Sequence, residues 1–337
     1  MTELTLEDIA KQVGVSRSTV SRVINGSPNV SPEVRERVLK AIQVTGYQPN
    51  AAARSLASQR SRMVGLVLPQ SVSSFFTDPF FPHLTQGIAF GCNNNDLTLS
   101  LFLAGNHEDE EKILPRISRR GLLDGVLVQS GQLGDWLIER LAKSSLPTVI
   151  IGRPFDPTGI NYIDVDNICG AHSATQHLIN LGYRRIAIIT GSEGSSVTID
   201  RLEGYKQALQ AAGLAVDEDL IAEGKFSEVS GYEAMKRLLP RRPDAIFASS
   251  DVMAAGAMRA LAEAGLCVPA DVAIVGYDDL PLANLTAVKL TTVRQPILKF
   301  GVKAVELLMD VIANGSQPAR RIILDTELVI RESCGAK

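Results

Sequence analysis

The chain has 337 residues, of which 45% are hydrophobic and 21% charged, an ordinary composition for a soluble protein of two or three domains. Taken alone, its formal net charge of −3 argues against binding to nucleic acid. The charge is unevenly spread, because residues 1–62 hold nine Lys and Arg against five Asp and Glu, whereas the rest of the chain holds 25 against 32. We therefore expect any contact with phosphate to be confined to the first 62 residues.

The cysteines and the apolar runs indicate the cellular compartment of the protein. The four cysteines are scattered and form no CxxC pair, so neither a zinc site nor a disulfide framework is predicted. The chain starts with polar residues and shows no signal-peptide core. No apolar run approaches the ~20 residues that a membrane helix needs. We expect a cytoplasmic protein that has no membrane partner and binds no metal.

The first 48 residues predict three short helices. Thr5 and Asp8 are spaced for a reciprocal cap of the first helix, and Gly14 ends it. Ser16 caps a second helix, and Ser31 with the following proline starts a third. Two helices joined by a short turn with glycine are typical of a helix-turn-helix. The same pattern also fits an ordinary three-helix subdomain with a solvated polar face.

In a helix-turn-helix, the second helix offers its first residues to base edges in the major groove. Here these residues are Arg17, which can bridge the O6 and N7 atoms of guanine, and Ser18, which can bond to several bases. Small polar side chains around them are expected to hold phosphates: Ser16, Thr19, Ser21 and Asn25.

Three segments resemble the start of lac repressor-type (LacI/GalR) bacterial transcription regulators. They are LEDIAKQVGVSRSTVSRVING at 6–26, VSPEVRERV at 30–38 and GYQPN at 46–50, and the resemblance continues to the C-terminus. It implies that Arg17, Ser18 and Arg22 contact operator bases. Two residues at the start of the first helix complete the expected contacts of this region with DNA: Thr5 and Leu6.

Residues 49–62 form a short, alanine-rich stretch that we interpret as a hinge helix and linker. Asn50 can cap the helix, which is too short to be stable alone in water and would order only when docked. Arg54 and Leu56 are its distinctive side chains. The resemblance implies that Leu56 wedges between base steps in the minor groove and bends the duplex. The alternative is a linker whose Leu56 rests on the body or on a partner chain.

From Val64 onward, short β-branched runs alternate with helical stretches, a pattern typical of parallel sheets covered on both faces. The predicted strands are 64–68, 98–103, 124–128, 148–151, 186–189, 245–248 and 272–275. Helices are predicted over 170–181, 202–212, 231–239 and 254–264. So many strands indicate two sheets rather than one.

The resemblance implies that this body has a type I periplasmic-binding-protein fold, with two doubly wound α/β subdomains and a ligand cleft between them. The first subdomain is expected at 63–164 plus 293–321, and the second at 165–292 plus 322–337. Ligands of doubly wound sheets bind beyond the carboxyl ends of the strands.

The segments that follow the strands supply the candidate ligand contacts. By motif, Arg201 and Asp278 match positions that hold the effector, and Phe226 and Ser250 match positions that line the cleft. Phe80 and Phe81 match paired aromatics in the first loop, at 73–82, which is longer than the common form of the family. Such side chains suit a small polar ligand, for example a sugar or a nucleobase. The aromatics could instead be core residues, and Asp251 and Asp279 could serve only as helix caps.

These observations predict a transcription regulator, a repressor in the favoured interpretation. Two copies would form a homodimer on a near-palindromic DNA operator, and a sugar-like effector would control the affinity. No phosphate loop, nucleophile elbow, HExxH or GxGxxG motif occurs, so neither catalysis nor a cofactor is expected. One alternative is a solute-binding receptor with the same body that acts without DNA. The other is a dinucleotide-dependent sugar oxidoreductase.

Overall fold

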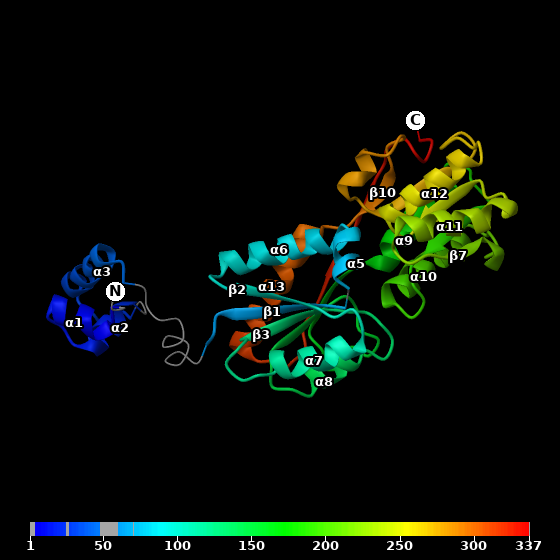
Figure 1. Cartoon of the computed structure of the whole chain (residues 1–337). Coiled ribbons are helices and arrows are strands. Elements are labelled where there is room, and N and C mark those ends of the chain that lie inside the picture. Colours follow the sequence, from blue (N-terminus) through cyan, green and yellow to red (C-terminus); the bar gives the residue numbers. More distant parts are fainter. Residues whose placement is uncertain (1–3, 25–26, 48–59, 70, 337) are drawn as a thin grey trace. The chain divides into compact units, whose positions relative to one another are not determined.

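The structure is a computed structural model that describes residues 4–24, 27–47, 60–69 and 71–336, apart from the side chains of residues 73 and 74 (Figure 1). The chain divides into two compact units, Met1–Ser61 and Arg62–Lys337, which we call the head and the body. Some predicted features lie outside the described residues: the hinge helix, Asn25, Asn50, Arg54 and Leu56.

The head contains three helices with the predicted caps. Their bounds are α1 Leu6–Val13, α2 Arg17–Ile24 and α3 Pro32–Thr45. The Thr5 side chain accepts the Asp8 N–H while Asp8 reaches back to the Thr5 backbone, which completes a capping box. Ser16 Oγ accepts the N–H of Thr19 at 3.1 Å. Gly14 takes the left-handed conformation (φ 72°) that ends α1, a conformation that glycine adopts without strain.

One small apolar core holds the three helices of the head together. Its buried members come from every helix and from the second residue after α3: Ile9, Ala10, Val13, Val20, Val23, Val38 and Tyr47. The spacing of the apolar residues buries one side of α2 and leaves Arg17, Ser18 and Arg22 on the exposed side. The sequence alone therefore accounts for the fold of the head.

The body contains two six-stranded sheets, and we name each sheet with its helices a lobe. The first lobe has strand order β11-β5-β4-β3-β1-β2, and the second has β12-β10-β9-β8-β6-β7. All neighbours pair in parallel except the edge strand β12, which is antiparallel to β10. The bounds in the first lobe are β1 Met63–Leu68, β2 Thr98–Leu103, β3 Gly125–Gln129, β4 Thr148–Ile151, β5 Tyr162–Val165 and β11 Arg321–Leu324. Those in the second are β6 Ile186–Thr190, β7 Ile221–Glu223, β8 Ala245–Ala248, β9 Ala273–Asp278, β10 Thr291–Arg294 and β12 Glu327–Val329.

Helices cover both faces of each sheet. The first lobe has α5 Val72–Thr77, α6 Phe80–Asn94, α7 His107–Ile117, α8 Trp136–Ala142 and α13 Ile297–Asn314. The second lobe has α9 Asn167–Asn180, α10 Ser196–Ala211, α11 Glu228–Leu238 and α12 Asp251–Glu263, with short 3-10 turns η1 Glu218–Leu220, η2 Leu239–Arg241 and η3 Pro281–Asn284. Among the described residues, no helix is both long enough and apolar enough to span a membrane.

Strand β1 shows how the layers form. Leu66 and Leu68 belong to the apolar cluster with α6 and α13, whereas Val67, which points the opposite way, belongs to the cluster with α7 and α8. Figure 1 shows α6 and α13 side by side along the first sheet. They approach closely at glycines, because a Cβ on Gly87 would lie 2.4 Å from the carbonyl oxygen of Leu298. The near-continuous apolar runs of the sequence reflect this burial on two faces.

The chain passes between the lobes three times, after β5, after β10 and after β11. The predicted subdomain boundaries at 164/165, 292/293 and 321/322 therefore fall inside strands. Residue 165 still pairs with β11 of the first sheet, and Thr291–Arg294 pairs as a whole with β9 of the second. None of these three strands was predicted from the sequence.

Two local predictions need correction. Three of the four predicted body helices begin three residues too late, because each helix starts directly after a capping residue. The helix predicted from 202 begins six residues too late, because α10 starts at Ser196. Asp166, Ser227 and Ser250 each accept a backbone N–H three residues ahead, at the starts of α9, α11 and α12. The predicted loop at 73–82 is mostly helical, since α5 occupies its first half and α6 begins at Phe80.

Candidate functional site

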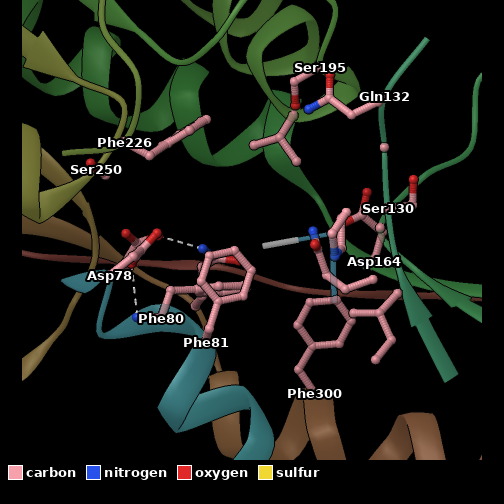
Figure 2. Close-up of a pocket in the computed structure, with 18 of the residues that line it drawn as sticks. Asp78, Phe80, Phe81, Ser130, Gln132, Asp164, Ser195, Phe226, Ser250 and Phe300 are labelled. Atoms are coloured by element: carbon pink, nitrogen blue, oxygen red, sulfur yellow. Dashed lines mark hydrogen bonds between the residues drawn. The ribbon is translucent and has the colours of Figure 1, made fainter. Parts of the chain in front are cut away.

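A cavity of about 300 Å³ lies between the two lobes of the body, at the carboxyl ends of their strands (Figure 2). Its volume is at the lower end of the ~300–1,000 Å³ typical of small-molecule sites. All six side chains predicted to contact an effector line it: Phe80, Phe81, Arg201, Phe226, Ser250 and Asp278. The lining also includes residues that the sequence analysis did not name: Pro69, Asp78, Gln129, Ser130, Gly131, Gln132, Ile151, Gly152, Asp164, Ser195, Val197, Gln295 and Phe300.

Four phenylalanines contribute to the apolar part of the cavity wall, together with Pro69, Ile151 and Val197. Phe80 and Phe81 begin α6 and meet edge to face, with ring centroids 5.5 Å apart. Phe300 comes from α13, and Phe226 comes from the opposite lobe, where its backbone has a φ of +51°. Such a conformation is uncommon for a bulky residue and occurs where surrounding structure holds it. The predicted aromatics thus face the cavity, although Phe80 and Phe81 do so from a helix rather than from a loop.

Arg201 is the cation of the cavity and is held by the second lobe. It lies on α10 with 3% of its surface exposed. Its Nε donates to Asn167 Oδ1 at 2.9 Å, and Nη1 donates to the Ser249 carbonyl oxygen at 2.5 Å. The guanidinium stacks 3.6 Å from the ring centroid of Tyr277, and Nη1 is 3.9 Å from Asp278 Oδ1. These contacts fix the side chain before any ligand binds.

Asp278 ends strand β9 with a strained backbone, at φ 115°. Gln295 Nε2 donates to its Oδ1 at 2.6 Å. Burial raises the pKa of Asp278, and the charge of Arg201 opposes this rise. A buried carboxyl with one amide donor and a cation 3.9 Å away is poised to accept hydrogen bonds from a ligand.

Two further carboxyls line the cavity and were missed by sequence reasoning. Asp78 accepts the N–H of Phe80 at 3.0 Å, and burial raises its pKa to about 6. Asp164 lies in β5, accepts the N–H of Val165 at 2.8 Å, and has a pKa that burial raises to about 6. The position of Asp78 two residues before the paired aromatics was the signal that could have identified it. Asp164 was hidden because β5 was not predicted.

The acidic neighbours of Asp278 have structural partners and do not line the cavity. Asp279 binds Arg294 Nε at 2.7 Å and Arg331 Nη2 at 2.6 Å. Asp251 accepts the N–H of Leu280 at 2.7 Å. Both residues were also considered as helix caps. Asp251 is the first residue of α12, which Ser250 caps, and Asp279 ties the C-terminal segment to β9 and β10.

Contacts between the lobes close one side of the cavity. The Ser196 N–H donates to the Gly131 carbonyl oxygen at 2.7 Å, and the Leu133 N–H donates to that of Gly194 at 2.9 Å. Gln132 and Ser195, which form an isolated antiparallel bridge between these bonds, line the cavity themselves. The first turn of α10 thus bonds to the first lobe instead of to a capping side chain.

Some of the head residues predicted to contact DNA are exposed, and others already form hydrogen bonds with their neighbours. Arg17, Ser18 and Arg22 are exposed on one side of α2. Ser16 Oγ lies 2.8 Å from the hydroxyls of both Ser18 and Thr19, so these three hydroxyls already form a local network. The polar side of α2 offers arginines and serines side by side, which suits base edges and phosphates.

Three more predicted contacts of the head have other local roles or are only partly exposed. Thr5 caps α1, and Leu6 is half-buried against the head core. Ser21, on α2, is half-buried as well. Across the described residues of the whole chain, no three His, Cys, Asp or Glu side chains are arranged to hold a metal ion.

Comparison with known proteins links the two units to described families. Residues 5–50 match the model of bacterial regulatory proteins of the lacI family, and residues 175–334 match a periplasmic binding protein-like domain. The chain is 40% identical over 333 residues to the HTH-type transcriptional regulator CelR of Thermobifida fusca, which covers 98% of each protein. It is 35% identical to the HTH-type transcriptional repressor PurR of Haemophilus influenzae (strain PittEE), again over 98% of each.

Solved structures agree with the sequence matches. A transcriptional regulator CelR–cellobiose complex is similar with a TM-score of 0.79 and 38% identity, covering 98% of this chain and 99% of that one. The lac repressor dimer bound to operator and the anti-inducer ONPF is similar with a TM-score of 0.86 and 27% identity, covering 99% and 100%. The predicted class of protein is therefore confirmed: the chain belongs to the lacI family of bacterial regulatory proteins, whose members are DNA-binding transcription regulators with a helix-turn-helix head and a periplasmic-binding-protein-like body.

Proposed function

We propose that this regulator binds a sugar or sugar derivative in the cavity of the body, and that binding changes its affinity for operator DNA. The observation that carries the proposal is the composition of this cavity, where four aromatic rings, three carboxyls, one guanidinium and several amides and hydroxyls from both lobes meet. A similar protein of known structure is a complex with cellobiose, which supports a sugar as the ligand.

The chemistry of the wall fits a sugar ring. Aromatic faces can cover the apolar C–H face of a pyranose, while carboxylates and amides bond to its hydroxyls. Within this site we assign Arg201 and Asp278 to direct contact with the ligand, with Phe80, Phe81 and Phe226 as apolar walls. Ser250 contributes its hydroxyl at the start of α12, although that hydroxyl already accepts the Met253 N–H at 3.2 Å.

We further propose that two copies form a homodimer whose heads read two half-sites of a near-palindromic operator. The exposed side of α2, with Arg17, Ser18 and Arg22, would enter the major groove. Leu56 would enter the minor groove at the centre of the operator. A dimeric lac repressor bound to operator is among the similar structures and supports this arrangement. In this role the protein is a cytoplasmic repressor without catalytic activity or cofactor.

The effector would act through the separation of the lobes. Because the cavity is lined from both lobes, a ligand that contacts both changes the balance between closed and open forms. Such a change, passed to the first lobe and the hinge, couples the ligand and DNA sites reciprocally, typically by about 1–3 kcal/mol.

The test begins with selection of genomic fragments by the full-length protein, followed by fluorescence anisotropy with the selected operator. Titration with a panel of mono- and disaccharides should identify at least one sugar that shifts operator affinity about fivefold or more. Selection of no defined sequence would contradict the DNA-binding part of the proposal. Specific DNA binding that no sugar changes would contradict the effector part alone.

A further inference from the structure

The segment 72–78 lies beside the cavity and packs in an apolar cluster that contains side chains of both lobes. Its helix α5 leaves the first lobe after β1, yet the buried side chain of Phe75 belongs to the same apolar cluster as Val252 and Leu280 of the second lobe. Leu282 of η3 packs against that cluster as well. Apolar contacts with both lobes therefore hold the segment in place.

This anchoring brings the carboxyl of Asp78 to the cavity wall. Asp78 follows α5 directly, and Pro79 separates it from Phe80, whose N–H it accepts at 3.0 Å. Figure 2 shows Asp78 at the start of the helix that carries Phe80 and Phe81, on the side of Ser250 and Phe226 of the second lobe. The same short segment thus supplies both a charge and two aromatic rings to the site.

The ionisable groups of the cavity lining are strongly unbalanced. Among the described residues, three carboxyls line it, those of Asp78, Asp164 and Asp278, against the single guanidinium of Arg201. Arg201 is already bonded to Asn167 and Ser249, which limits what it can offer to an anion. The nearby Arg153 does not line the cavity.

The carboxyls also influence one another. Burial raises the pKa of Asp278, Arg201 lowers it, and the negative charge of Asp78 raises it further. Burial raises the pKa of Asp78 to about 6, while the Phe80 N–H and the charge of Arg201 lower it. Asp78 and Asp278 thus act on the same guanidinium from opposite lobes. Near neutral pH, an anionic ligand would meet carboxylates in a site that screens charge poorly.

We propose that the cavity selects uncharged, hydroxyl-rich effectors and rejects their phosphorylated and carboxylate forms, and that Asp78 is the residue that determines this specificity. The inference rests on the proposed effector function and narrows its ligand class. Hydroxyl groups can donate to all three carboxylates, whereas a phosphate or carboxylate group can only accept and would leave them unmatched.

The experiment compares matched ligands on the full-length protein by isothermal titration calorimetry at pH 7.5. Three sets serve as probes: glucose with glucose 6-phosphate and glucuronate, cellobiose with cellobionate, and ribose with ribose 5-phosphate. In the wild type, at least one neutral sugar should bind, and its anionic forms should bind at least tenfold more weakly. Asp78→Asn should reduce the ratio between the affinities for the neutral and the anionic form at least threefold, because asparagine still accepts the Phe80 N–H but carries no charge.

Asp96→Asn is the matched control. Asp96 is exposed after the other end of α6, so this substitution removes the same charge from the same lobe about 20 Å away along the helix. The control should keep the wild-type ratio. Anionic forms that bind wild type as tightly as neutral ones would overturn the proposal and leave the effector function standing. Equal ratios for the two variants would overturn the role of Asp78. Binding of no ligand at all would overturn both.

Discussion

Arg153 of the first lobe and Asp200 of the second lobe form a two-point salt bridge, with Nε–Oδ2 and Nη2–Oδ1 distances of 2.9 and 2.6 Å. Arg153 follows β4, and Asp200 lies on α10, one residue before Arg201 of the cavity. The bridge therefore stabilises the closed arrangement of the lobes through α10, the helix that carries Arg201.

Breaking this bridge should weaken effector binding. Arg153→Ala and Asp200→Asn are each expected to lower effector affinity by about 1 kcal/mol, because opening of the lobes then competes with the closed form. The Arg153 side chain keeps 32% exposure, so solvent screening holds the effect below the ~3–5 kcal/mol of a fully buried pair. Calorimetry on both single variants and the double variant measures it. Strictly additive losses would contradict a direct coupling. Lys112→Ala, which breaks an exposed pair with Glu108, should have no effect.

The adjacent carboxylates Asp278 and Asp279 should have different roles, the first in effector binding and the second in stability. Asp278→Asn is expected to reduce effector response at least tenfold while operator binding persists, since Asp278 lines the cavity. Asp279→Asn is expected to lower the free energy of unfolding by about 2–3 kcal/mol, because it weakens the bonds of a buried carboxylate to Arg294 and Arg331. Asparagine has the same branching as aspartate, and it tolerates the left-handed φ of 56° at position 279. Urea unfolding and effector titrations separate the two outcomes. A normal effector response in Asp278→Asn would contradict the assigned site.

Arg17 should provide sequence preference rather than general affinity for DNA. Its exposed position at the start of α2 allows a forked bond to guanine, which is worth about 1–3 kcal/mol of discrimination. Arg17→Ala should therefore lose at least fivefold more affinity for the selected operator than for scrambled DNA of equal length. Lys40→Ala, on the exposed side of α3, is the control and should affect both DNAs alike. Equal losses in Arg17→Ala would argue against base contact.

Stability should depend on pH through Asp78. Its pKa is 3.8 in an unfolded chain and about 6 in the fold, where burial raises it. Between these values the folded state holds the proton more tightly, so stability from this group is present below pH 3.8 and lost as the pH rises through 6. Asp78→Asn should therefore raise the free energy of unfolding at pH 7.5 by on the order of 1–2 kcal/mol, and give no gain at pH 4. A gain independent of pH would contradict this assignment. Asp96→Asn serves as the control.

The hinge prediction concerns Leu56, which lies outside the described residues. Leu56→Ala should reduce the bend of operator DNA and weaken specific binding by a few kcal/mol or less, because the wedge between base steps is lost. Leu56→Met retains a large apolar side chain and should preserve most of the bend. Energy transfer between dyes on the two ends of the operator reports the angle. An unchanged bend in Leu56→Ala would indicate that this side chain packs elsewhere.

Local sequence determined the head and most of the body. The caps at Thr5, Ser16 and Ser31 and the turn at Gly14 depend on neighbours within four residues, so they could be predicted from spacing. Strands such as Ile186–Thr190 could be predicted for the same reason, because burial on two faces leaves a continuous apolar run. The resemblance of whole motifs then identified Arg201 and Asp278, which the structure brings to one cavity with the other four predicted side chains.

The tertiary structure alone decided which further residues join them. Asp78, Asp164 and Phe300 lie far apart in the sequence and meet only because the chain passes between the lobes and parallel strands end at one edge. The bridge between Arg153 and Asp200 depends on how the two lobes close on each other, and no local pattern encodes that. Sequence patterns report which face of an element is buried, whereas contacts between elements depend on the order of the strands and on packing across the whole body.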